Sequence, residues 1–251
     1  MAKYSHDRVV PFKDSELGKK QQVADMFDRI AFRYDFLNRF LSGGIDIYWR
    51  RRAIRELAKT KPQRVLDVAT GTGDMAIMLT KYISSVRVTG IDISNGMLEI
   101  GRQKINRLKL TQQIDLLEGD SEAIRFPDNH FDAVTVAFGV RNFENLEKGL
   151  QEMLRVLKPG GRLVVLEFSQ PKTPVICQIY DGYLRLVAPR VGRMVSSSRE
   201  AYQYLNDSVR AFPEGEDFVR ILDKTGYVHT GLRRLSLGIC SLYMGEKGVP
   251  L

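Results

Sequence analysis

The ten residues VLDVATGTGD, at positions 65–74, combine an apolar run with two glycines and two carboxylates. Gly71 and Gly73 have the spacing of loops that bring the backbone close to a ligand, and such loops commonly hold phosphate at a helix N-terminus. Asp74 stands where a pyrophosphate would lie, and its charge would repel that ligand. The loose match of residues 71–76 to the dinucleotide pattern G-x-G-x-x-A is therefore weak evidence for a nicotinamide cofactor.

A cofactor with positive charge and no phosphate removes this conflict. S-adenosylmethionine carries a sulfonium and an amino group, and a carboxylate such as Asp67 attracts the amino group. The Gly71-Thr72-Gly73 turn admits the methionine part of the cofactor against the backbone. A buried structural role would explain Asp67, and a place at a helix N-terminus would explain Asp74. Neither role explains the whole sequence of residues 65–74. We therefore expect S-adenosylmethionine as the cofactor, held by Asp67 and this turn.

Two further strand ends carry acids. Asp92 follows Gly73 by 19 residues, close to the roughly 20-residue spacing at which an acid takes ribose hydroxyls. That acid alone does not distinguish S-adenosylmethionine from a nicotinamide cofactor, because both contain an adenosine ribose. Asp120 and Ser121 follow the third expected strand, where an acid can accept the hydrogens of an adenine amino group. Acids at three successive strand ends favour an adenosyl cofactor.

Strand and helix patterns alternate through the middle of the chain. Apolar runs predict strands at 64–70, 86–94, 113–120, 131–139 and 162–169. Apolar residues at steps of three and four predict helices at 75–83, 97–108 and 146–157. This alternation with short links indicates an α/β fold with a Rossmann-like, doubly wound and mostly parallel sheet.

Both ends of the chain depart from the alternation. Residues 1–20 are polar and are expected to form a loose arm, followed by helices at 23–41 and 49–58. After Pro174 a segment rich in large apolar side chains predicts an inserted helical cover. The chain then ends with expected helices at 202–211 and 216–224, and with strands at 232–238 and 239–245 that form an antiparallel ending and complete seven strands.

Composition limits the partners and the compartment. The formal net charge of +8 favours an anionic partner, but no nucleic-acid motif accompanies it, so no nucleic acid is expected. The run at 50–52, three arginines, is interpreted as a solvated helix face. Cys177 and Cys240 have no metal-ligand spacing, so no metal is expected, and two reduced thiols are typical of the cytoplasm. No apolar run reaches about 18 residues and no signal-peptide pattern occurs, so no transmembrane helix is expected.

Two longer stretches carry a more specific pattern. Residues 34–49 read YDFLNRFLSGGIDIYW, and residues 155–169 read RVLKPGGRLVVLEFS. In these stretches the chain resembles the ubiquinone/menaquinone biosynthesis C-methyltransferase family, whose first signature is Y-D-x-M-N-x-x-[apolar]-S-x-x-x-H-x-x-W. Leu37 replaces the Met and Asp46 replaces the His of that signature, whereas the second signature fits throughout. The resemblance extends over essentially the whole chain through FGVRN at 138–142, PRVG at 189–192 and YQYL at 202–205.

The resemblance implies a class I methyltransferase that uses S-adenosylmethionine to methylate a ring carbon of a prenylated quinol. Demethylmenaquinol is the expected substrate, and the benzoquinol of ubiquinone biosynthesis is the alternative. Residues 1–60 are expected to form an arm and substrate-side helices, and residues 61–251 a methyltransferase domain with a helical insertion at about 174–212, together a single globular unit. The expected location is the cytoplasm at the inner face of the membrane, with weak association to that surface, and a homodimer is considered.

The resemblance also implies the residues at the site of methyl transfer. Arg141 and Asn142 follow the fourth strand, and Tyr34 comes from the N-terminal helix. Arg141 is not a base at neutral pH, but it can stabilise a phenolate or polarise a water that accepts the proton. Tyr34 can hydrogen-bond the quinol oxygen, although its place on an apolar helix stripe suits core packing equally well. Asp46 receives no catalytic role, because it puts a carboxylate where the family has an imidazole.

The remaining expectations concern the histidines and the prenyl tail. His6, His130 and His229 lie outside the matched motifs and are expected to be solvated. The tail requires an apolar channel. Its candidate residues, each explained equally well as core, are Phe27, Phe36, Phe40, Ile176, Ile179, Tyr180, Tyr183, Leu184 and Val187.

Three other functions remain open at this point. The basic charge keeps an RNA or small-molecule methyltransferase of the same fold in view, although residues 34–49 argue against it. An NAD-linked oxidoreductase would need a glycine where the chain has Ala76, and it would have to tolerate Asp74. A cofactor-bound scaffold in a quinone-synthesis complex would keep the binding motif and lack methyl transfer.

Overall fold

A seven-stranded sheet forms the centre of the molecule. The computed structural model describes residues 4–171 and 199–249. The strands lie in the order β3-β2-β1-β4-β5-β7-β6, and β7 runs antiparallel to both β5 and β6. Their bounds are β1 Arg64–Val68, β2 Arg87–Asp92, β3 Ile114–Glu118, β4 Phe131–Ala137, β5 Leu157–Phe168, β6 Tyr227–Leu235 and β7 Cys240–Lys247. The predicted doubly wound sheet with an antiparallel ending is confirmed.

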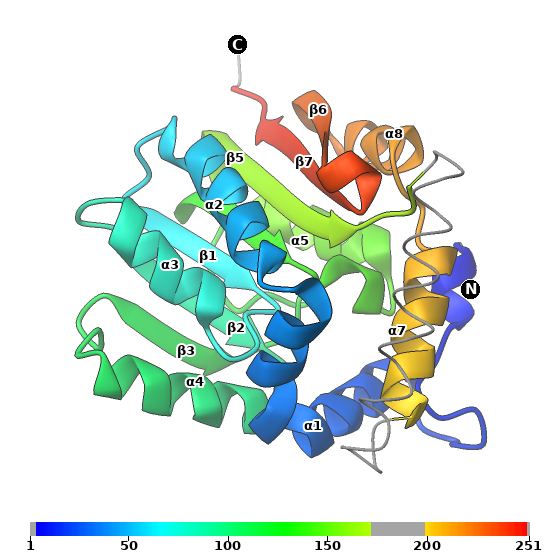
Figure 1. The fold of residues 1–251 in the computed structure, drawn as a ribbon. Helices are drawn as coiled ribbons and strands as arrows, with labels where there is room; N and C mark the ends of the chain where they lie inside the picture. Colours follow the sequence, from blue (N-terminus) through cyan, green and yellow to red (C-terminus); the bar gives the residue numbers. More distant parts are fainter. Residues whose placement is uncertain (1–3, 172–198, 250–251) are drawn as a thin grey trace.

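Helices cover both faces of this sheet (Figure 1). Those that follow or precede the strands are α2 Ile45–Ala58, α3 Asp74–Tyr82, α4 Asn95–Arg107, α5 Leu146–Val156 and α8 Glu216–Thr225. The outer elements are α1 Lys19–Ser42, α7 Arg199–Ala211 and the short 3-10 turns η1 Ser5–Arg8, η2 Val140–Asn142 and η3 Ser236–Gly238. Helix α7 lies within the span predicted as a helical insertion, about 174–212, of which residues 174–198 lie outside the described residues.

The core consists of two apolar layers separated by the sheet. Side chains of a strand alternate between its faces, so Val65 of β1 packs with α2, α3 and α4, whereas Leu66 and Val68 pack with α5 and α8. All three are fully buried. This burial on both faces explains why the central strands read as continuous apolar runs in the sequence.

Two strand predictions place the start of the strand five residues too late. Strand β5 begins at Leu157, five residues before the predicted start, because the chain pairs at Leu157, bulges through Pro159-Gly160-Gly161, and pairs again from Arg162. Strand β6 begins at Tyr227 rather than at 232. It lies at one edge of the sheet, and most of its side chains are partly or fully exposed, so its apolar alternation is weak.

The N-terminal segment is packed, not loose. The Tyr4 hydroxyl donates to Glu147 Oε1 at 2.5 Å, and η1 lies beside α7 (Figure 1). His6 is fully buried, so the prediction that it is solvated is wrong; burial lowers its pKa to about 4. Lys19 Nζ, also buried, donates to the carbonyl oxygens of His6 at 2.7 Å and of Arg141 at 3.5 Å. Contacts with Glu147 and with the Arg141 carbonyl, more than 120 positions further along the chain, hold this segment, and its composition did not reveal them.

Helix α1 lies across the carboxyl ends of the first strands and is bonded to the loops there (Figure 1). Asp28 Oδ1 accepts from Ser94 Oγ at 2.6 Å and from the Gly96 amide at 2.8 Å, at the start of α4. Asp35 accepts from the Thr72 hydroxyl in the turn after β1. The N-terminal helix therefore closes one side of the region where open α/β sheets bind ligands.

Candidate active site and cofactor pocket

Two adjoining cavities open at the carboxyl ends of β1, β2 and β4. The first encloses about 640 Å³, including space open to solvent, and the second about 340 Å³ on the same measure. Tyr34, Ala69, Gly71 and Ala137 line both cavities. An elongated ligand can therefore extend from one cavity into the other past these four residues.

The turn after β1 is shaped by residues in the left-handed region. Ala69, Gly71 and Gly73 have φ of 52°, 57° and 76°, a conformation that costs a residue with a Cβ roughly 1 kcal/mol or more. A Cβ on Gly71 would lie 3.5 Å from Met97 Cε and 4.0 Å from Tyr34, and would narrow the passage between the cavities. Gly73 lines neither cavity; it caps α3 and faces Leu116 and Ile105.

Asp67 lies at the floor of the second cavity. Its side chain is 1% exposed, and its Oδ2 accepts a hydrogen bond from Thr70 Oγ1 at 2.6 Å. The other oxygen, Oδ1, is buried and has no hydrogen-bond partner among the described residues. Burial raises the pKa of Asp67 to about 7. A buried carboxylate oxygen without a donor is costly, so a cationic donor at Oδ1 would stabilise it.

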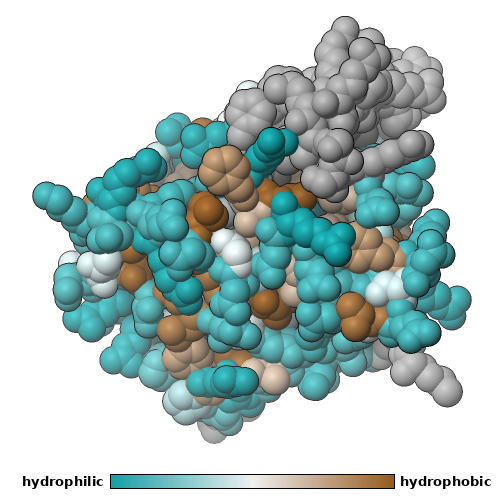
Figure 2. Space-filling view, turned by 90° about the horizontal axis from the view of Figure 1, so that it is seen from below, coloured by the Kyte–Doolittle hydropathy of each residue, from teal (hydrophilic) through white to brown (hydrophobic). Residues whose placement is uncertain are grey.

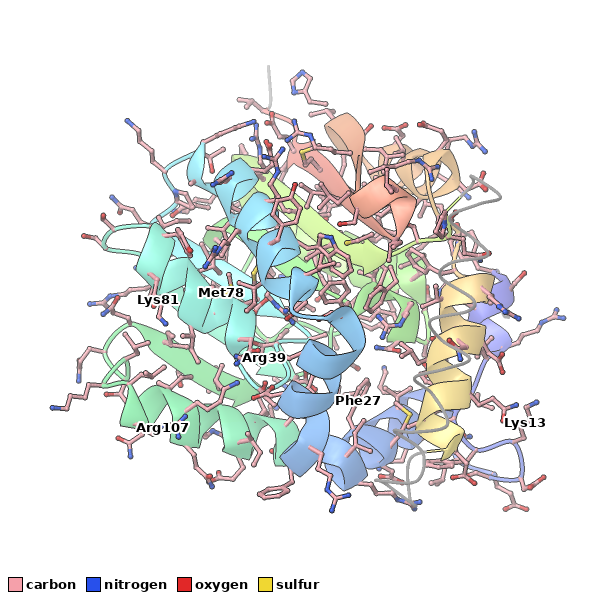
Figure 3. The ribbon with its side chains drawn as sticks, viewed as in Figure 1. Lys13, Phe27, Arg39, Met78, Lys81 and Arg107 are labelled. Carbon is pink, nitrogen blue, oxygen red and sulfur yellow. The ribbon has the colours of Figure 1, made fainter. Side chains whose placement is uncertain are left out.

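Asp74 is paired within the protein and is not free to repel a ligand. Lys104 Nζ donates to the Asp74 carboxylate. It also donates to Asp35 Oδ2 at 2.8 Å and to the Thr72 hydroxyl at 3.0 Å. Burial opposes ionisation of Asp74, but the charge and hydrogen bond of Lys104, together with the charges of Arg50 and Arg39, outweigh it and lower the pKa. Arg39 of α1 lies 3.9 Å from the same carboxylate, beside α3 in Figure 3. Thr72, a predicted ligand, lines the second cavity within this network.

Asp92 lines the first cavity at the end of β2 and ties the two turns together. Its oxygens accept from the Gly71 amide at 2.8 Å and from the Ser94 amide at 2.9 Å. Burial raises its pKa, and these backbone amides act against the rise. Each oxygen keeps further lone pairs, so Asp92 can also accept from a pair of ligand hydroxyls.

Asp120 and Ser121 line the first cavity beyond β3. Lys20 of α1 lies 2.7 Å from Asp120 and 3.3 Å from Glu122, and it lines the same cavity. The sequence analysis did not single out Lys20, because nothing in its local pattern indicates a contact with a residue 100 positions away. Helix α1 thus contributes side chains to both cavities.

The residues predicted for methyl transfer do not lie at equal depth. Tyr34 and Asn142 line the first cavity, and the Tyr204 hydroxyl of α7 donates to Asn142 Oδ1 at 3.1 Å. Arg141 lines neither cavity. Its side chain is 6% exposed and points to Glu167 Oε1 at 2.6 Å, while its Nε has no partner among the described residues.

The second cavity holds one residue that the sequence analysis misjudged. Arg50 is 7% exposed and lines this cavity, so the interpretation of residues 50–52 as a solvated face is wrong at this position. Its guanidinium is paired with Asp46, four residues earlier on α2, and lies 5.3 Å from the centre of the Phe138 ring. Asp46, which replaces the His of the first signature, is therefore a buried ion-pair partner.

The two cavities fit the expected cofactor. The first offers Asp92 for ribose hydroxyls and Asp120 with Ser121 for the base; the second offers the unpartnered oxygen of Asp67 for an amino group. Three carboxylates around the turn suit an adenosyl sulfonium better than a pyrophosphate.

Several other expectations can be placed. Phe27 lines the first cavity and projects from α1 in Figure 3. The other tail candidates lie outside the described residues or have side chains that the structure does not describe. No group of metal-ligating residues occurs within 4–171 and 199–249, and no helix in those ranges is long and apolar enough to cross a membrane. His229 is exposed, as predicted, whereas His130 is partly buried and stacks on Phe126.

Comparison with known proteins gives a consistent result. The model of the ubiE/COQ5 methyltransferase family matches residues 15–247. A demethylmenaquinone methyltransferase from Bacteroides fragilis is 44% identical over 245 residues, which cover 97% of this chain and 99% of the relative. The ubiquinone/menaquinone biosynthesis C-methyltransferase UbiE from Geobacter sulfurreducens is 46% identical over 92% of this chain and 90% of its own length.

The fold is also similar to solved structures. A SAM-dependent methyltransferase from Thermotoga maritima superposes with a TM-score of 0.63 at 20% identity, covering 89% of this chain and 99% of that one. At this identity the likeness concerns the fold alone.

Proposed function

The chain belongs to the ubiE/COQ5 methyltransferase family, and from this we propose that it transfers a methyl group from S-adenosylmethionine to a ring carbon of a prenylated quinol. Demethylmenaquinol is the proposed substrate, because relatives named demethylmenaquinone methyltransferase align over 97% of the chain. The single observation that carries the assignment in the structure is the acid-lined pair of cavities, which accepts an adenosyl sulfonium.

Residues in the two cavities would bind different parts of the cofactor. Asp92 would hold the ribose hydroxyls, and Asp120 with Ser121 would hold the adenine, all in the first cavity. Asp67 would hold the ammonium group, and Gly71 leaves room for the chain between the two ends. When bound, S-adenosylmethionine supplies an electrophilic methyl group on a sulfur that leaves as a neutral thioether.

Asn142 and Tyr34 would position the quinol. A ring carbon is a weak nucleophile, and removal of the neighbouring phenolic proton increases its electron density. The Asn142 side chain, held by Tyr204, and the Tyr34 ring face the first cavity, where they can orient the quinol oxygen. Holding the reacting carbon in line with the methyl group is mainly a positioning effect.

Arg141 would act on the quinol indirectly, because it does not line the first cavity. Its guanidinium is bound to Glu167 and to the Phe138 carbonyl, and the following residue, Asn142, faces the cavity. We propose that it fixes the backbone of η2 and that its positive charge favours the phenolate. Direct contact with the quinol would require the side chain to leave Glu167.

We also propose that the protein associates weakly with anionic membranes, where prenylated quinols reside. The formal charge of +8 supports this. Figure 2 shows mostly hydrophilic side chains with small separate apolar patches on the face seen from below. Phe32 of α1, 88% exposed, is one apolar side chain that can enter the interface. A homodimer and the absence of a nucleic-acid partner remain predictions.

Methyl transfer itself is the test. The purified protein is incubated with methyl-labelled S-adenosylmethionine and a reduced demethylmenaquinol analogue, and in parallel with a benzoquinol analogue. Label in the naphthoquinol supports the proposal, and label in both extends the substrate range. Tight cofactor binding without label in either quinol would refute the substrate assignment. The variant Asn142→Ala should lose transfer while it keeps cofactor binding, and Asn145→Ala, an α5 cap outside both cavities, serves as the control.

A further inference from the structure

Arg50 brings a positive charge to the end of the site where the proposed function places the amino-acid part of the cofactor. It lies on α2, outside the strand-end loops that carry the other ligands, and its side chain is 8% exposed. The side chain lines the second cavity together with Asp67 and Asp74. Among the described residues that line this cavity, Arg50 is the one with a cationic side chain.

Two polar atoms in this group are buried and have no hydrogen-bond partner within the described part of the chain: Arg50 Nε and Asp67 Oδ1. One is a donor with positive charge and the other an acceptor with negative charge. Unpaired buried groups of this kind are rare in native proteins and indicate a missing partner. A zwitterion, with a carboxylate and an ammonium group on one carbon, would satisfy both atoms together.

We propose that Arg50 binds the carboxylate of the cofactor's amino-acid end, and that Asp46 is the positioning residue that holds its guanidinium. The proposal rests on the proposed function, since it assumes an adenosyl amino acid as the ligand. Arg50 suits this role because a guanidinium offers several donors in a fixed plane and can bind two carboxylates at once. The charge of Arg50 also acts on Asp74, but the hydrogen bond to that carboxylate comes from Lys104.

Asp46 explains how the cation is kept in place without a ligand. The Ser42 hydroxyl donates to Asp46 Oδ1 at 2.8 Å, and the other oxygen binds Arg50 Nη1. The carboxylate is 4% exposed and lies one helical turn before Arg50. Asp46 therefore neutralises Arg50 in the free protein and leaves its Nε available to the ligand.

The test compares two ligands that differ in one group. S-adenosylhomocysteine has the carboxylate, and its decarboxylated analogue keeps the amino group alone. Isothermal titration calorimetry measures both dissociation constants for the unmodified protein, for Arg50→Gln and for the exposed control Arg51→Gln. A hydrogen bond between charged groups contributes about 1.5–3 kcal/mol, so Arg50→Gln should weaken S-adenosylhomocysteine about 10- to 100-fold. The same substitution should change the dissociation constant of the decarboxylated analogue less than about threefold.

A second variant keeps the test valid if Arg50→Gln unfolds. Asp46→Asn/Arg50→Gln removes both charges of the pair, so no buried carboxylate is left unpaired, and it should show the same selective loss. An equal loss for both ligands, or no loss for either, would overturn the role of Arg50 while leaving the cofactor assignment intact. If the unmodified protein binds neither ligand, the proposed function fails as well.

Discussion

Replacing Glu167 by glutamine should destabilise the protein strongly although the side chain keeps its shape. Glu167 is fully buried and binds Arg141 Nη1 at 2.6 Å, and Arg141 itself is only 5% exposed. Glu167 Oε1 also accepts from the Phe168 amide at 2.9 Å. Glutamine removes the negative charge and leaves the guanidinium buried without a counter-ion. Breaking a buried ion pair on one side costs about 3–5 kcal/mol.

The effect is large enough to measure by thermal unfolding. For a protein of 251 residues, about 1 kcal/mol corresponds to roughly 2–4 °C, so the melting temperature should fall by roughly 6–20 °C. The matched control is Asp217→Asn, which breaks an ion pair with Arg220 in which both side chains are more than 60% exposed. Exposed pairs contribute at most about 1 kcal/mol, so the control should melt within a few degrees of the unmodified protein.

A double variant separates loss of charge from loss of packing. Arg141→Met/Glu167→Leu replaces the pair by apolar side chains and should recover much of the stability, because no charge remains buried. It should not recover methyl transfer if Arg141 stabilises the phenolate. The reasoning is refuted if Glu167→Gln melts as the control does, or if the double variant is less stable than the single one.

Three further predictions test the cofactor loop. Because burial raises the pKa of Asp67 to about 7, the native carboxyl keeps its proton between its usual pKa and 7 while the unfolded chain loses it, so stability falls as pH rises across this window and the contribution is gone above about 7. S-adenosylhomocysteine binding should tighten over the same range. In Asp67→Asn, thermal unfolding should lack the first change and titration calorimetry should lack the second. Gly71→Ala should weaken that ligand at least tenfold by calorimetry, because a Cβ enters the passage. Gly43 has the same φ of 57° as Gly71 and open space around it. Gly43→Ala should therefore lower the stability of the protein and leave ligand binding unchanged. Lys104→Met removes a donor that joins α1, the turn and α3, and limited proteolysis should cut α1 faster than in the exposed control Lys81→Met.

The sequence was sufficient for the central sheet and for the glycine turn after β1. Both depend on local signals: β1 and β2 are buried on two faces, and the glycine turn after β1 requires left-handed residues. Asp92 could be predicted because the spacing of a strand, a helix and a strand fixes where it lies. The edge strand β6 was displaced by five residues, because an exposed strand lacks the apolar alternation that marks its start.

The partners of the charged residues required the tertiary structure. Asp74 appeared to face a ligand, but Lys104, thirty residues away, neutralises it. His6 appeared solvated, yet it is buried within the N-terminal turn η1, with its ring against Phe212. Arg50 has the same local sequence context as its exposed neighbour Arg51, and only the position of α2 above the β1 turn buries one of them.

Sequence thus determined which residue types gather at the strand ends and therefore which class of ligand suits them. Spacing along the chain sets this, because alternating strands and helices bring consecutive strand ends to one edge of the sheet. The tertiary structure decided which of those charges are already paired. Ion pairs such as Arg141 with Glu167 join residues 26 positions apart, and the strength of each depends on burial, which a local pattern does not contain.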